Sequence, residues 1–207
     1  MDKFNVFPDK SISQNGPVSQ MFIDRNIASF HGACRHVHEL PYGYNSNRDD
    51  LMILFKENKG TCTTKHAVIG TLAKELSLPV YKHVGIYAMT EEIVSGTRDL
   101  LVRFRLPYIP MLHCFLVYEN FRVDLTEGNA NGKNRSIEDF LFEKQVPSAI
   151  SAKDEYLLYR NALKETVLKR PEISGADIKH ILQAREEGLN LLKSGVEKAR
   201  FPSGSYN

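Results

Sequence analysis

The sequence has few cysteines, little net charge and no long hydrophobic run. Its three cysteines are an odd number without the spacing of a disulfide framework, which favours a reducing compartment and predicts a cytoplasmic protein. The formal net charge of +2, without a run of lysines and arginines, argues against a nucleic-acid partner. The longest apolar stretches are strand-sized and interrupted, so the sequence predicts neither a signal peptide nor a membrane partner.

What remains is the composition of an ordinary globular protein. Hydrophobic residues make up 42% and charged residues 25% of the 207 residues, which is enough for a substantial core. We expect one domain over residues 1–207, with a core at about 49–142 and a helical extension at about 148–200. Two amphipathic patterns separated by Arg170-Pro171 predict helices there, which complete the core or form a subunit contact. Residues 201–207 are expected to be frayed, and no pattern predicts the oligomeric state.

The most informative stretch is Gly60 to Glu75, where a cysteine precedes a helical pattern. After Cys62 the apolar residues recur at a spacing of three to four, as on the buried face of a helix. Cys62 is therefore expected in the first turn, where unpaired N–H groups and the helix dipole lower the pKa of a thiol. Gly60 suits a tight turn through its freedom at positive φ, and Thr61 suits an N-cap. This arrangement is typical of a cysteine nucleophile.

A base and an orienting carboxylate follow in the segment from Pro110 to Thr126. Apolar and β-branched residues flank the turn-like pair Glu119-Asn120, which predicts two antiparallel strands joined by a hairpin. His113 lies near the start of the first strand and Asp124 near the end of the second, so the hairpin brings them roughly opposite each other. The spacing predicts a Cys-His-Asp triad of Cys62, His113 and Asp124.

With these three motifs in this order, the sequence resembles the transglutaminase-like superfamily, as a small member of bacterial type. The matching residues are Cys62 in Gly-Thr-Cys-Thr-Thr-Lys-His, His113 in Leu-His-Cys-Phe-Leu and Asp124 in Val-Asp-Leu-Thr. The resemblance implies an α+β fold with a cysteine-protease-like core, in which the nucleophile helix packs on an antiparallel sheet between N-terminal and C-terminal helical additions. It also implies a hydrolase or acyltransferase that acts on an amide bond of a peptide or protein. No cofactor is implied, and the short interval between His113 and Asp124 implies a tight hairpin.

The loop from Leu40 to Asp50, close before the nucleophile helix, is a possible source of an oxyanion donor. Tyr44, Asn45 and Asn47 are the candidates, and the alternative for the asparagines is that they only form turns. Lys65 and His66 lie one turn past Cys62 and are expected to be exposed or packed helix residues. Their side chains cannot both approach the sulfur, so neither is expected to be the catalytic base.

Two other functions stay open on the sequence. The first is a binding or scaffolding module that keeps the fold without catalysis. The second is a metal site, because a helix that starts at Pro17 and continues through His38 would place His31, Cys34 and His38 on one face. Paired-ligand spacings with a fourth ligand are missing, so we expect no metal.

Two further segments have a predicted secondary structure but no predicted functional residue. Residues 90–106 fit either a helix or a strand. Ser136, after a polar loop, is expected to cap a helix.

Overall fold

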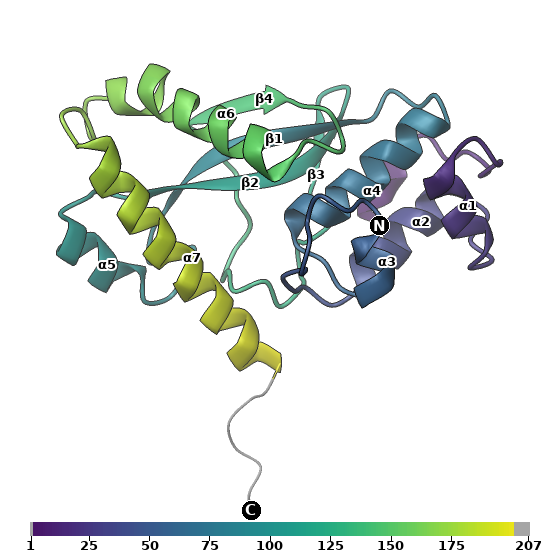
Figure 1. Ribbon diagram of the computed structural model, residues 1–207, viewed down its shortest axis with the longest axis horizontal. Coiled ribbons are helices and arrows are strands. Elements are labelled where there is room, and N and C mark those ends of the chain that lie inside the picture. Colours follow the sequence, from purple (N-terminus) through teal and green to yellow (C-terminus); the bar gives the residue numbers. More distant parts are fainter. Residues whose placement is uncertain (1, 201–207) are drawn as a thin grey trace, which may run out of the picture. The chain divides into compact units, whose positions relative to one another are not determined.

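The computed structural model describes residues 2–200, and the expected fraying of residues 201–207 lies outside this range. The sheet has the strand order β3-β2-β1-β4 and is antiparallel, so the α+β class expected from the sequence is confirmed. In chain order (Figure 1) the elements are η1 (Lys3–Val6), α1 (Pro17–Ile23), α2 (Phe30–Glu39), α3 (Ile53–Glu57), α4 (Cys62–Glu75), β1 (Tyr81–Met89), α5 (Thr97–Phe104), β2 (Ile109–Tyr118), β3 (Phe121–Val123), β4 (Phe142–Gln145), α6 (Ala152–Glu165), η2 (Val167–Lys169) and α7 (Ile178–Arg200).

The chain divides into two compact units. The first comprises Met1–Val84, Cys114–Asn129 and Lys144–Ala152, and the second comprises Gly85–His113, Ala130–Glu143 and Lys153–Asn207. Strands β1 and β2 each contribute residues to both units. The single domain expected over residues 1–207 stays a prediction.

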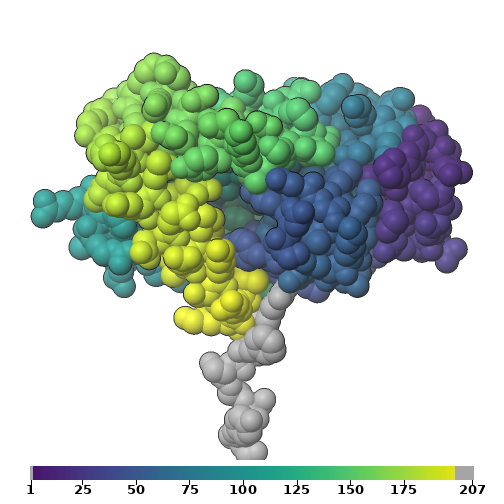
Figure 2. Space-filling view, in the orientation of Figure 1, coloured from purple at the N-terminus to yellow at the C-terminus, as the bar shows by residue number. Residues whose placement is uncertain are grey.

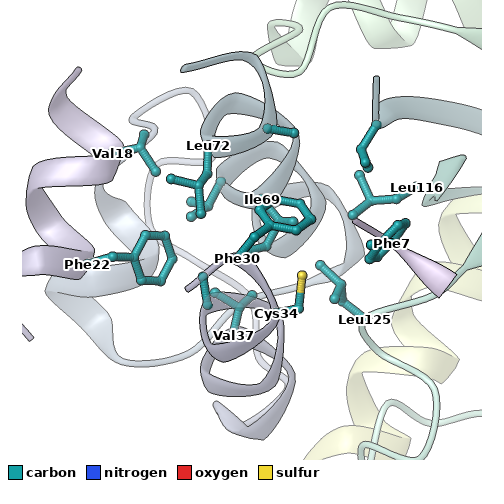
Figure 3. Close-up of a cluster of buried hydrophobic side chains, with 14 of the residues drawn as sticks. Phe7, Val18, Phe22, Phe30, Cys34, Val37, Ile69, Leu72, Leu116 and Leu125 are labelled. Carbon is teal, nitrogen blue, oxygen red and sulfur yellow. The ribbon is translucent and has the colours of Figure 1, made fainter. Parts of the chain in front are cut away.

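The first unit is built around α4, most of whose residues are buried. Helices α1, α2 and α3 all pack against it, and residues of the N-terminal helices, purple to blue in Figure 2, form an adjoining stretch of surface. The core between these helices is apolar, and Leu116 of β2 and Leu125, which follows β3, also belong to it. Figure 3 shows Ile69 and Leu72 of α4 among Phe7, Val18, Phe22, Phe30, Cys34, Val37, Leu116 and Leu125.

The continuous helix expected from Pro17 through His38 is wrong, because the chain forms two helices there. Asn26 adopts a left-handed backbone conformation with φ of 57° between α1 and α2. Ser29 then caps α2 by accepting a hydrogen bond of 3.2 Å from the N–H of Gly32 to its Oγ. Phe22 of α1 and Phe30 of α2 are both buried in the same core. The spacing of these apolar residues in the sequence therefore does not reveal the break between the two helices.

The hairpin expected at Glu119-Asn120 is confirmed. β2 and β3 pair antiparallel with Leu116 opposite Val123 and Tyr118 opposite Phe121, which leaves a two-residue turn. Glu119 takes φ of 52° in that turn, as a tight hairpin requires of a central residue.

The second unit is helical around the inner strands. Residues 97–104, left open between helix and strand, form α5, which packs against α7. α6 and α7 confirm the two helices expected after residue 148. The helix expected at Ser136 is wrong: residues 136–140 form neither helix nor strand, and Leu141 donates its N–H to the carbonyl of Ile86 at 2.7 Å. Within residues 2–200, no helix is both long and apolar enough to cross a lipid bilayer.

Candidate active site

Cys62 is the first residue of α4, as the sequence predicts. Thr61 precedes it as the N-cap, and its N–H donates a hydrogen bond of 3.1 Å to Oγ1 of Thr64. This closes half of a capping box and fixes the first turn. Cys62 is 9% exposed, so the sulfur lies in a largely desolvated place at the positive end of the helix dipole.

Gly60 is required because the side chains of Thr64 and Leu54 pack closely against its Cα. The sequence suggested instead that Gly60 adopts a positive φ. A Cβ at Gly60 would lie 2.7 Å from Oγ1 of Thr64 and 2.9 Å from Cδ1 of Leu54. The backbone of Gly60 also pairs with the preceding loop: its N–H donates to the carbonyl of Pro41 at 3.1 Å, and its carbonyl accepts from the N–H of Gly43 at 3.2 Å. The turn before Cys62 is thereby joined to the loop that carries Tyr44.

Tyr44 is the oxyanion candidate whose hydroxyl is subject to the charge of Cys62. Its side chain is half-buried, and burial raises the pKa of its hydroxyl; the negative charge of the Cys62 thiolate raises this pKa further. The phenol therefore stays protonated at neutral pH and can donate a hydrogen bond. The rings of Tyr42 and Tyr44 pack edge to face with centroids 6.2 Å apart, which restricts the ring of Tyr44.

Asn45 links its loop to the start of α4. Its Oδ1 accepts a hydrogen bond of 2.9 Å from Oγ1 of Thr64, and its Nδ2 donates to the carboxylate of Glu57 and the carbonyl of Lys59, both at 3.0 Å. These bonds use the acceptor and both amide protons. Asn45 therefore acts here as a link between loop and helix.

Asn47 forms a turn. Its Oδ1 accepts a hydrogen bond of 3.1 Å from the N–H of Asp49 two residues on, which is the Asx-turn arrangement, and the residue is exposed. This is the turn-forming role that the sequence left open for the asparagines.

His66 is packed and fully buried, one turn past Cys62. Its Nδ1 donates a hydrogen bond of 2.6 Å to the carbonyl oxygen of Cys62, and its Nε2 accepts one of 2.8 Å from the N–H of Leu125. Both ring nitrogens are bound to backbone, so the ring links the nucleophile turn to the segment after β3.

Asp124 follows β3 directly and is partly exposed. Its Oδ1 lies 3.5 Å from Nε2 of His66 and accepts two hydrogen bonds of 2.7 Å from Thr126, one from the N–H and one from Oγ1. Nε2 of His66 already accepts a hydrogen bond from the N–H of Leu125, so its approach to Asp124 is not an ion pair while the ring is neutral. Cys62 and Asp124 thus approach the same imidazole, one through its carbonyl and the other through its carboxylate.

His113 belongs to the second unit, whereas Cys62 and Asp124 belong to the first. It lies in β2, is 2% exposed and packs edge to face against Tyr87 with ring centroids 6.4 Å apart. The next residue, Cys114, is fully buried, and its Sγ lies 3.7 Å from Oγ1 of Thr63.

Lys65 is a site-adjacent residue whose contacts sequence reasoning missed. Its side chain is fully buried, and its ammonium group donates to the carbonyls of His38 and Leu40 and to Oδ1 of Asn129. Burial lowers its pKa to about 8, while the nearby carboxylate of Asp124 acts in the opposite direction.

The helix face considered as a metal site does not bring metal ligands together. His31 bonds to the carbonyl of Phe7 through Nε2 at 2.8 Å, and His38 bonds to the carbonyl of Leu125 through Nδ1 at 2.9 Å. Cys34 lies in the apolar core (Figure 3), where burial raises the pKa of its thiol. In the part of the chain that the structure describes, no three or more His, Cys, Asp or Glu residues are grouped to bind a metal ion.

Comparison with known proteins adds no assignment. No protein-family model, curated protein or solved structure matches this chain. The residues around Cys62 are thus the basis for assigning a function.

Proposed function

We propose that this protein is a thiol-dependent acyl-transfer enzyme of the transglutaminase-like type, with a cysteine-protease-like core and Cys62, His113 and Asp124 as its triad. The observation that carries the proposal is the position of Cys62 as the first residue of a capped helix, where the charge of its thiolate acts on the hydroxyl of Tyr44. Helix N-termini lower thiol pKa values, and a protonated tyrosine hydroxyl is a suitable donor to an oxyanion.

In the proposed reaction, His113 takes the proton of Cys62 and the thiolate attacks the carbonyl carbon of an amide in a peptide or protein. Asp124 keeps the imidazole in one tautomer and stabilises the imidazolium. The tetrahedral oxyanion is met by the N–H of Cys62 and the hydroxyl of Tyr44. Collapse expels the amine, which receives the proton from His113 and leaves a thioester on Cys62. Water then gives a hydrolase product, and a second amine gives a transferase product.

One observation favours the alternative, a catalytically inactive binding or scaffolding module of the same fold. Oδ1 of Asp124 accepts two hydrogen bonds from Thr126, which is a common local use of Asp after a strand. A carboxylate kept only for this turn would leave His113 without an orienting partner.

The test is the order in which the three cysteines are alkylated by iodoacetamide at pH 7, followed by peptide mapping. We expect Cys62 to react first, because it is at a helix start and 9% exposed, whereas Cys34 and Cys114 are 0% exposed. The urea-unfolded protein is the control, in which all three should react at similar rates. Prior labelling of Cys34 or Cys114 in the folded protein would contradict the proposal.

A further inference from the structure

A fully buried lysine lies one helical turn from the proposed nucleophile. Lys65 Nζ donates hydrogen bonds of 3.0 Å to the carbonyl of His38, 2.5 Å to the carbonyl of Leu40 and 2.6 Å to Oδ1 of Asn129. Burying an ammonium group is costly unless its N–H groups are bound. Three oxygen acceptors match its three protons.

These acceptors belong to two different segments of the first unit. His38 and Leu40 end α2 and begin the loop that leads to Tyr44. Asn129 ends the segment that starts at Asp124, and its Nδ2 donates to the carbonyl of His38 at 2.9 Å. The ammonium group of Lys65 therefore joins both segments to α4 at one point.

A second contact supports the same connection. His38 Nδ1 bonds to the carbonyl of Leu125, and the N–H of Leu125 bonds to His66 on α4. The end of α2, the segment after Asp124 and the first turns of α4 are thus closed into one polar network. Lys65 contributes to this network an ammonium group that binds both segments, whereas the ammonium group of Lys3 donates to the carbonyls of Asp124 and Glu127 in the second segment.

We propose that Lys65 is a positioning residue, whose ammonium group fixes the loop that carries Tyr44 and the segment that carries Asp124 on the nucleophile helix. Its effect on the two segments stands by itself, and its effect on Cys62 rests on the proposed function. Lys65 touches neither the thiol nor the substrate in this account.

The test compares Lys65→Met with Asn129→Ala and with Lys82→Met as a matched control. Methionine retains much of the length of lysine but donates no hydrogen bond. Asn129 is only partly buried, so its variant removes one acceptor with little risk to folding. Lys82 is 1% exposed and also donates to carbonyls, those of Thr63 and Ser148, but to neither of the two segments.

The first readout is amide hydrogen exchange at Gly43 and Leu125, which lie in the two segments. We expect exchange to accelerate at least about 10-fold in Lys65→Met and less in Asn129→Ala, relative to amides in the middle of α4. In Lys82→Met we expect exchange at Gly43, at Leu125 and in the middle of α4 to accelerate equally, by the amount that the loss of global stability accounts for. Unchanged exchange at both amides would overturn the inference, whatever Cys62 does.

The second readout is the pH profile of Cys62 alkylation. We expect Lys65→Met to move it to higher pH by about one unit, which is about 10-fold slower labelling at pH values below both thiol pKa values. If the wild-type thiol has a lowered pKa and the profile of Lys65→Met does not move, the inference is also overturned. If the wild-type thiol itself titrates as an ordinary cysteine, the proposed function fails, and the exchange data alone decide whether Lys65 positions the segments.

Discussion

The N–H of Leu125 donates a hydrogen bond of 2.8 Å to Nε2 of His66, which fixes the proton state of this buried ring. Because Nε2 accepts, the ring proton lies on Nδ1, which donates to the carbonyl of Cys62 at 2.6 Å. His66 is therefore a neutral structural link across the candidate site.

Replacing His66 by Leu should lower the free energy of unfolding by about 2–4 kcal/mol, because the N–H of Leu125 and the carbonyl of Cys62 lose their partners. The measurement is urea unfolding at pH 7. The control is His180→Leu, which removes one hydrogen bond of 2.7 Å to the carbonyl of Phe104 in a part-buried place and should cost less. Equal losses in the two variants would contradict the linking role of His66.

Lys65 should make the protein more stable as the pH rises from about 8 towards 10. Its pKa is lowered from 10.5 to about 8 in the folded state, mainly by burial; Asp124 raises it and Lys3 lowers it. Between these values the unfolded chain binds more protons than the folded one, so the free energy of unfolding increases with pH, by up to about 3 kcal/mol.

Urea unfolding at a series of pH values, for the wild type and for Lys65→Met, isolates this contribution. The difference between the two proteins should grow in favour of the wild type above pH 8, since all other groups titrate in both. A difference that stays constant from pH 7 to 10 would show that Lys65 keeps its ordinary pKa.

Local patterns in the sequence were sufficient for the elements that carry the proposed triad. The start of α4 at Cys62 follows from the apolar spacing behind it, and the β2–β3 hairpin follows from the Glu119-Asn120 pair. Both depend on residues that are neighbours in the chain. The edge strand β4 was not predicted, because a contact with a distant segment, from the N–H of Val146 to the carbonyl of Lys82, stabilises it. The break between α1 and α2 was also not predicted, although its Ser29 cap is local in the sequence.

The polar contacts around the site were also not predictable from the sequence. The bonds of Asn45 to Glu57 and of Lys65 to Asn129 join segments that are separated in the chain. One signal was present for Lys65: it lies three residues before Val68 and seven before Leu72, on the apolar face of α4. A lysine on such a face must find buried acceptors.

Replacing Asp124 by Asn separates an orienting carboxylate from one that only forms a turn. Asparagine keeps a carbonyl oxygen that can accept the two hydrogen bonds from Thr126, so the free energy of unfolding should change by less than about 1 kcal/mol. It loses the charge that stabilises an imidazolium, so the pKa of Cys62 should rise and alkylation at pH 7 should slow by about 10-fold or more.

The measurements are the pH profile of Cys62 alkylation and the thermal unfolding midpoint of the wild type and Asp124→Asn. A profile that coincides with that of the wild type would remove Asp124 from the triad, whatever happens to the midpoint. Thr126→Val is the control for the local turn, since it removes the hydroxyl that donates to Oδ1 and should leave the profile in place.

The most direct test of the proposed function is the pH profile of Cys62 alkylation in the wild type and in His113→Ala. If His113 is the base, the wild-type thiol should remain reactive well below pH 8.5, the ordinary thiol pKa, and His113→Ala should slow labelling at pH 6–7 by about 10-fold or more. His83→Ala, which changes a half-buried histidine that packs against Phe115 in the first unit, should match the wild type. A wild-type profile that rises only near pH 8.5 and does not move in His113→Ala would contradict the account.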